Sequence, residues 1–155
     1  MDRLNVLVVE DGDEYTTTLG RFAGDVLDLT RAGDGAAALR ALAAAPFDVL
    51  FLDMRFDRVP PGALLGDMGA LVERFGDAVR ARAYLEVNQG AYVLAAVREA
   101  GHQLPAVFSY DFDGSPARWE AIRAKYAPVA YLPDNASAAE IRSVLLGIGR
   151  GTGPS

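Results

Sequence analysis

The chain has 155 residues, of which 51% are apolar and 23% are charged. This length and balance predict one folded domain and exclude a disordered or collagen-like chain. The absence of cysteine excludes a disulfide framework, a thiol nucleophile and a cysteine-ligated metal, and the single histidine, His102, disfavours a histidine-based metal site.

Charge is distributed unevenly along the chain. The net charge is −6, and residues 1–56 carry ten acidic against five basic side chains. A negatively charged surface repels the phosphates of nucleic acids, so we predict no nucleic-acid partner and favour a bound cation. We find no signal-peptide pattern and no apolar run of roughly 18 residues, which predicts a cytoplasmic protein with no membrane partner.

Apolar runs and helical patterns alternate along most of the chain. In chain order, the first part predicts a strand over residues 4–9, a helix over 15–22, a strand over 26–30, a helix over 35–45 and a strand over 47–52. The last part predicts a helix over 91–99, a strand over 104–108, a helix over 115–126, a strand over 129–132 and a helix over 137–148. Asp34 is expected to cap its helix, and Pro116 is favoured in a first turn. Ser137 and Glu140 have the spacing of a capping box.

This order of elements predicts an α/β fold, because strands that alternate with helices pair in parallel through right-handed crossovers. We expect a doubly wound five-stranded parallel sheet of order 2-1-3-4-5 with flanking helices. In such sheets ligands bind beyond the carboxyl ends of the strands, where the strand order reverses. The residues that follow the first and third strands are therefore the first candidates for a site.

Three carboxylates occupy those positions. Glu10 and Asp11 follow the first strand, and Asp53 ends the third. Carboxylates placed so close repel one another unless a hard cation lies among them, and Mg²⁺ prefers oxygen ligands. Beside such a cation Asp53 could accept a phosphoryl group, because carboxylates form aspartyl-phosphates. The alternative is that these acids only solubilise the ends of the strands.

The chain resembles the receiver domains of bacterial two-component response regulators, which have the flavodoxin-like, CheY-like fold. The resemblance rests on Val8-Val9-Glu10-Asp11, on the segment from Ala32 to Leu39 and on Leu52-Asp53-Met54-Arg55. It implies a Mg²⁺ site formed by Glu10, Asp11, Asp53 and the backbone carbonyl of Arg55. It also implies that a histidine kinase or another signalling partner phosphorylates Asp53.

Three further positions are compared with this family. The resemblance implies that Tyr131 is the aromatic switch residue of the fifth strand. It implies that Ser109 is the hydroxyl residue that binds the phosphoryl group, although a count from Pro105 makes Tyr110 the alternative. The family has a lysine three residues after the aromatic, and here that position holds Asp134. An acid there adds repulsion, so it favours a pseudo-receiver that is not phosphorylated over a phosphorylated switch.

The segment between Asp53 and Pro105 is about 25 residues longer than one helix and two short loops require. An apolar stripe at helical spacing predicts an amphipathic helix over residues 64–80, although Gly69 and Gly76 weaken it. This helix could pack on the domain's own surface, or it could bind a partner or form a homodimer. A third possibility is that an arginine neutralises the acidic pocket, the candidates being Arg55, Arg58, Arg80 and Arg82.

The sequence therefore predicts a receiver-like domain over residues 1–149, with a helical insertion at about 57–87 and a flexible tail over 150–155. We expect a module that acts in signal transduction through protein–protein interaction, and not an enzyme. The alternative from another class is a small Mg²⁺-dependent phosphatase or phosphotransferase, with Asp53 as nucleophile and Asp57 as general acid.

Overall fold

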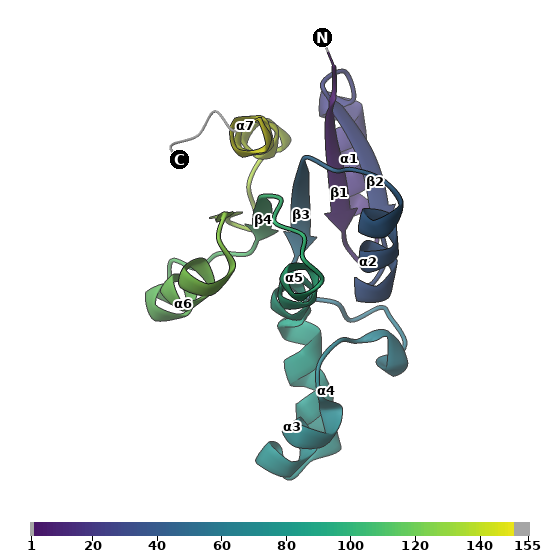
Figure 1. The fold of residues 1–155 in the computed structure, drawn as a ribbon. Helices are drawn as coiled ribbons and strands as arrows, with labels where there is room; N and C mark the ends of the chain where they lie inside the picture. The colour runs from purple at the N-terminus through teal and green to yellow at the C-terminus, as the bar shows by residue number, and fades with distance from the viewer. Residues whose placement is uncertain (1, 151–155) are drawn as a thin grey trace.

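A parallel sheet forms the centre of the computed structural model, which describes residues 2–150 (Figure 1). Its five strands are β1 (Leu4–Val9), β2 (Leu27–Ala32), β3 (Val49–Asp53), β4 (Ala106–Ser109) and β5 (Val129–Leu132). The strand order is β2-β1-β3-β4-β5, and all four pairings are parallel. The predicted fold class and strand order are confirmed.

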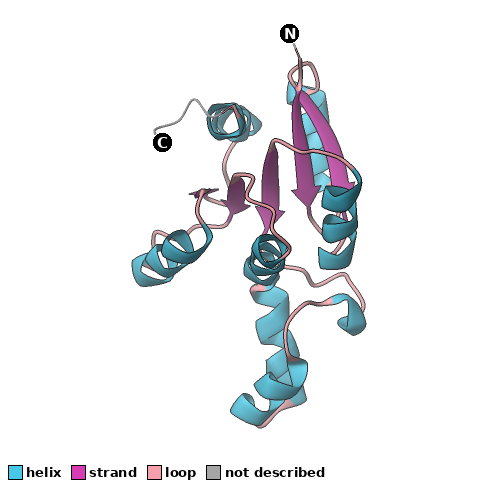
Figure 2. Ribbon diagram, viewed as in Figure 1, coloured by secondary structure: helices cyan, strands magenta, loops and turns pink. Residues whose placement is uncertain are grey.

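Helices cover both faces of this sheet (Figures 1 and 2). One face packs against α1 (Glu14–Ala23) and α7 (Ala138–Gly149). The other face packs against α2 (Gly35–Ala44), α5 (Gln89–Glu99) and α6 (Pro116–Tyr126). No helix within residues 2–150 has the length and apolar character that crossing a membrane requires.

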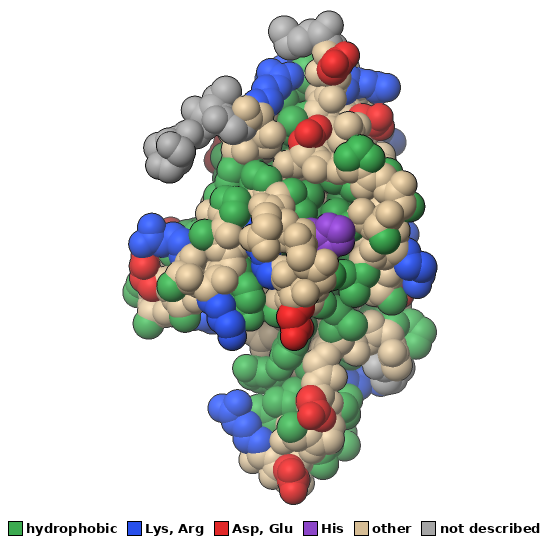
Figure 3. All heavy atoms as spheres, in the orientation of Figure 1, with side chains coloured by type: hydrophobic (Ala, Val, Ile, Leu, Met, Phe, Trp, Pro, Cys, Tyr) green, Lys and Arg blue, Asp and Glu red, His purple; other side chains and the backbone are tan. Residues whose placement is uncertain are grey.

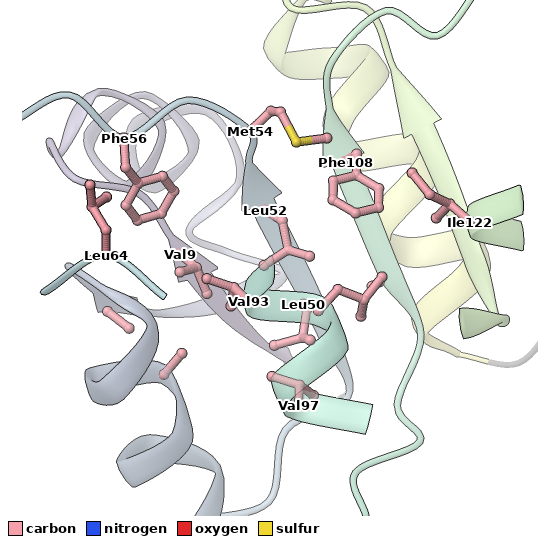
Figure 4. Close-up of a cluster of buried hydrophobic side chains, with 14 of the residues drawn as sticks. Val9, Leu50, Leu52, Met54, Phe56, Leu64, Val93, Val97, Phe108 and Ile122 are labelled. Carbon is pink, nitrogen blue, oxygen red and sulfur yellow. The ribbon is translucent and has the colours of Figure 1, made fainter. Parts of the chain in front are cut away.

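The central strands β1, β3 and β4 are buried on both sides, and their successive side chains belong to different cores because they point to opposite faces. On β1, Val6 and Val8 belong to the core under α1 and α7, whereas Leu7 and Val9 belong to the core under the other three helices. Figure 4 shows the second core, where apolar side chains of β3 and β4 meet those of α5. This two-sided burial explains why the central strands are mostly apolar, whereas the edge strand β2 alternates apolar and polar residues.

The three start signals predicted for the helices after Asp34, Ser115 and Ser137 are confirmed. The Asp34 carboxylate accepts a hydrogen bond of 2.8 Å from the backbone N–H of Ala37. Pro116 lies in the first turn of α6, and Ser137 and Glu140 form the predicted capping box of α7. These local signals therefore fix where the helices begin.

The single amphipathic helix predicted over residues 64–80 is wrong. A 3-10 turn, η1 (Pro61–Ala63), is followed by two helices, α3 (Met68–Phe75) and α4 (Ala78–Val87). Gly76 ends α3 in the left-handed conformation, with φ of 68°, and Asp77 then caps α4 by accepting from the N–H of Val79. Because this break turns the chain, Val79 leaves the apolar face on which it was expected and is 77% exposed.

The inserted helices are anchored beside the carboxyl end of β3. Figure 1 shows α3 and α4 projecting from the sheet beyond α5. The buried Gln89 side chain accepts from the N–H of Leu65 at 2.7 Å and donates to the Leu65 carbonyl at 3.1 Å. Gly90 packs so tightly that an added Cβ would lie 2.5 Å from the carbonyl oxygen of Asp53. The junction of α4 and α5 therefore forms one wall of the region around Asp53. The predicted tail beyond Arg150 lies outside the described residues.

Candidate functional site

Asp53 is the last residue of β3, and it lies opposite Ser109 of β4 in the parallel register. Both residues line a cavity of about 240 Å³, together with Val87, Tyr110 and Asp134. The sheet therefore brings Asp53, Ser109 and Asp134 together, and Tyr110 lies in the same wall as Ser109. Strands β3 and β4 contribute Asp53 and Ser109 to the lining of this cavity, and the end of α4 contributes Val87.

The pKa of the Asp53 carboxyl is raised above its ordinary value. Burial raises its pKa to about 6, and the negative charges of Asp11 and Glu10 add to this effect. The backbone N–H groups of Met54 and Arg55 act in the opposite direction, because they donate to the carboxylate. Asp53 is thus ionised at neutral pH, and its negative charge is poorly compensated by its surroundings.

The Glu10 carboxylate accepts hydrogen bonds from backbone N–H groups at the start of α1. The carboxylate is 1% exposed and accepts from the backbone N–H groups of Tyr15 at 3.1 Å and Thr16 at 2.8 Å. The Thr16 hydroxyl donates to it as well, at 2.6 Å. The residue before α1, Asp13, makes no capping bond. Glu10 therefore satisfies N–H groups that a helix start leaves without an intrahelical partner, and its charge suits the positive end of the helix dipole.

Asp11 holds the loop that follows β3. Its side chain is 2% exposed, and Oδ2 accepts from the backbone N–H groups of Asp57 at 2.9 Å and Arg58 at 2.8 Å. The Arg58 guanidinium lies 3.9 Å from Oδ1 and also binds Glu14 at 2.7 Å. Asp11 is therefore partly neutralised from within the chain.

These contacts bear on the expected Mg²⁺ site. Carboxylate and carbonyl oxygens are the donors that Mg²⁺ prefers, so the residue types suit the ion. Part of this donor set is already engaged by hydrogen bonds within the chain. Within residues 2–150, no three acidic or histidine side chains form a group that could hold a metal ion. Both oxygens of Glu10 and one oxygen of Asp11 are bound by N–H groups instead.

The four candidate arginines have different partners. Arg58 reaches Asp11, as described above, but Arg55 pairs with Asp57 at 3.2 Å. Arg82 lies 3.7 Å from Glu86, and the Arg80 guanidinium lies 5.4 Å from the centre of the Phe75 ring. No ion pair to Asp53 is formed within residues 2–150. Asp57, the acid required by the phosphatase alternative, does not line the Asp53 cavity.

Two residues of this region were missed by sequence reasoning. The Tyr15 hydroxyl is hydrogen-bonded to the Ser109 hydroxyl, and burial raises the pKa of Tyr15, with further increases from the charges of Asp53 and Asp134. Arg31 donates to the backbone carbonyls of Asp11 and Gly12. Arg31 could have been found, because it lies near the carboxyl end of β2, where it pairs in register with Val8 of β1. Tyr15 carried no signal beyond its place in a helix.

Tyr131 lies away from the Asp53 cavity. Its hydroxyl donates to the Asp113 carboxylate. Its ring packs edge-on against Phe112 and Trp119, with centroid distances of 5.3 Å and 4.8 Å. Tyr131 therefore belongs to an aromatic cluster between β5 and α6, and it does not line the cavity around Asp53.

Comparison with solved structures identifies the fold. The receiver domain of the Francisella response regulator 1452 superposes with a TM-score of 0.66 and 17% identity, covering 97% of this chain and 100% of that one. A two-component response regulator from Clostridium difficile gives 0.64 at 12% identity, with 98% and 100% covered. The receiver domain of NtrX from Brucella abortus gives 0.62 at 16% identity, with 94% and 98% covered.

The chain thus has the receiver-domain fold over nearly its whole length. No family model matches the sequence, and no curated protein is similar to it. At identities of 12–17%, the similarity establishes the architecture.

Proposed function

We propose that this chain is a receiver-fold signalling module that binds partner proteins in the cytoplasm without phosphorylation of Asp53. The observation that carries this proposal is the state of Asp11, because its Oδ2 accepts from the N–H groups of residues 57 and 58 and its Oδ1 lies 3.9 Å from the Arg58 guanidinium. Because the fold is that of receiver domains, a histidine kinase or another signalling protein is the expected class of partner.

Electrostatics supports the same conclusion. Phosphorylation would replace the single carboxylate charge of Asp53 by up to about two phosphoryl charges beside Asp11 and Glu10, whose charges already raise the pKa of Asp53. Asp134 lines the same cavity at the position where the family has a lysine. An acid at that position repels the phosphoryl group that a lysine would attract. The acidic pocket therefore opposes phosphorylation.

A second candidate function is a switch in which Asp53 is phosphorylated with the help of Mg²⁺. One observation favours it, because Asp53 and Ser109 lie side by side at a cavity that is open to a small phosphodonor. This function requires Glu10 and Asp11 to exchange N–H donors for a cation. The Ser109 hydroxyl would also have to leave Tyr15.

Titration with Mg²⁺ distinguishes the two candidates. If the chain acts without phosphorylation of Asp53, we expect no heat of Mg²⁺ binding. We also expect the same melting temperature in millimolar MgCl₂ as in NaCl of equal ionic strength. A Mg²⁺-specific rise in melting temperature that is lost in Asp53→Asn would contradict the first candidate and support the second, because a ligand stabilises the folded state that binds it.

A further inference from the structure

A groove between α5 and α6 is separate from the Asp53 cavity. The part of it nearest α4 has a volume of about 340 Å³ and is lined by ten residues, which are Tyr84, Asn88, Ala91, Tyr92, Ala95, Arg118, Ala121, Ile122, Lys125 and Tyr126. A second hollow of about 480 Å³ continues it and shares Ala95, Lys125 and Tyr126 with it. The two together follow α5 from Asn88 to Glu99, a length of about 16 Å.

Small side chains keep this groove open. On α5 the lining residues Ala91 and Ala95 are one turn apart, and Ala121 faces them from α6. Tyrosine rings form the walls, with Tyr84 contributed by the inserted helix α4 and Tyr126 by the end of α6. The extra segment thus builds one wall of the groove.

The charge of the groove is opposite to that of the protein. Arg118 and Lys125 are the charged residues that line the part nearest α4, and Arg98 and Glu99 add one charge of each sign in the second hollow, whereas the whole chain carries −6. Neither Arg118 nor Lys125 forms an ion pair within residues 2–150. Arg118 donates to the side chain of Asn88, and the Lys125 ammonium lies 5.5 Å from the centre of the Tyr126 ring. Figure 3 shows basic and hydrophobic side chains beside one another over α6.

We infer that this groove binds an acidic amphipathic helix of a partner protein, with apolar side chains over the alanines and carboxylates on Arg118 and Lys125. A groove of two helix faces suits a third helix. Arg118 and Lys125 are seven residues apart, two turns or about 10 Å along α6, so the partner's carboxylates should also be about seven residues apart. This inference rests on the proposed function and names the chemistry of its partner.

A second copy of the chain does not meet this requirement. Among the helices of residues 2–150, none carries two acidic residues: α2 has none, and each of the others has one. Within the helical residues themselves, no helix of one protomer therefore carries a pair of carboxylates for Arg118 and Lys125 of another. We therefore commit to a helix of a different protein as the occupant, and a second copy of the chain is an outcome that the test below distinguishes.

Selection of peptides from a random phage-displayed library on the unphosphorylated full chain tests this inference. We expect recovered peptides with apolar residues between two acids about seven positions apart. Fluorescence polarisation should show that Lys125→Glu weakens binding of the best peptide at least tenfold. The matched control Arg123→Glu makes the same charge change on the same helix outside the groove lining, and it should have no effect.

Three results would overturn the inference. They are the absence of any enriched peptide, recovered peptides that bind wild type and Lys125→Glu equally, and a concentration-dependent dimer that Lys125→Glu abolishes. Arg118→Gln provides a second variant that removes charge without reversing it, and it should weaken the peptide as well. None of these measurements involves a phosphodonor or Mg²⁺. Phosphorylation of Asp53 would refute the proposed function but leave the peptide result intact.

Discussion

Replacing Asp53 by asparagine is expected to stabilise the protein above neutral pH and to have little effect in acid. The folded-state pKa of Asp53 is about 6, raised from an ordinary 3.8 by burial and by Asp11 and Glu10. The folded state therefore holds this proton more tightly than the unfolded state does. Ionisation of Asp53 thus lowers stability progressively as pH rises from about 4 to about 6, and the full penalty persists above that range.

The size of this penalty follows from the shift. A difference between 3.8 and about 6 corresponds to about 3 kcal/mol at roughly 1.4 kcal/mol per unit. Because Asp53 is only partly buried, solvent screening reduces this to about 1–2 kcal/mol. Asn can still accept from the N–H groups of Met54 and Arg55, so the substitution removes charge with little change in shape. A chain of this size should gain about 2–8 °C in melting temperature at about pH 8.

Thermal unfolding at about pH 4 and about pH 8 measures this effect. The two proteins should melt together at the lower pH, and Asp53→Asn should melt higher at the upper pH. Asp25→Asn is the control, because Asp25 is exposed and its substitution makes the same charge change. A melting temperature for Asp53→Asn at or below that of the wild type at about pH 8 would refute this reasoning.

Three further substitutions probe the framework around the site. Gly90→Ala should destabilise by about 1–3 kcal/mol in urea unfolding, because the new methyl group would lie 2.5 Å from the Asp53 carbonyl oxygen, and an unchanged midpoint would contradict that packing. Asp11→Ala should destabilise by about 1–3 kcal/mol and speed amide exchange at residues 57 and 58, whereas unchanged exchange would show that the carboxylate does not hold the loop. Ser137→Ala removes the capping box of α7 and should lower stability by about 1 kcal/mol, measured by urea unfolding, and no loss would mean the cap is dispensable.

Much of the architecture could be predicted from the sequence, because the signals were local. Continuous apolar runs marked strands that are buried on both faces, and β1 and β5 have the bounds that were expected. Parallel pairing then implied that Asp53 and the end of β4 would be neighbours. The register places Ser109 beside Asp53, although a count along the sequence had left Tyr110 as the alternative.

The helices of the insertion were harder to predict, because the apolar spacing and the helix-end signals disagreed there. The spacing of apolar residues favoured one helix over 64–80, whereas Gly76 followed by Asp77 is typical of a helix end and a new start. The local signal decided the structure, since the left-handed Gly76 ends α3. The apolar period alone overestimated the length of the helix.

The contacts of Glu10 and Asp11 could not be predicted. Their partners are mostly backbone N–H groups of α1 and of the loop after β3, and such donors leave no pattern of residue types in a sequence. The acids were expected to need a cation because they lie close together. Helix and loop N–H groups provide part of that compensation instead.

Intact mass after incubation with acetyl phosphate tests the central claim most directly. The wild type and Asp53→Ala should be compared with and without Mg²⁺, and the proposed function predicts no phosphoryl adduct on either protein. A Mg²⁺-dependent adduct on the wild type that is absent from Asp53→Ala would contradict the proposal. It would show that Glu10 and Asp11 release their N–H partners, and that the pocket works as a phosphorylated switch despite Asp134.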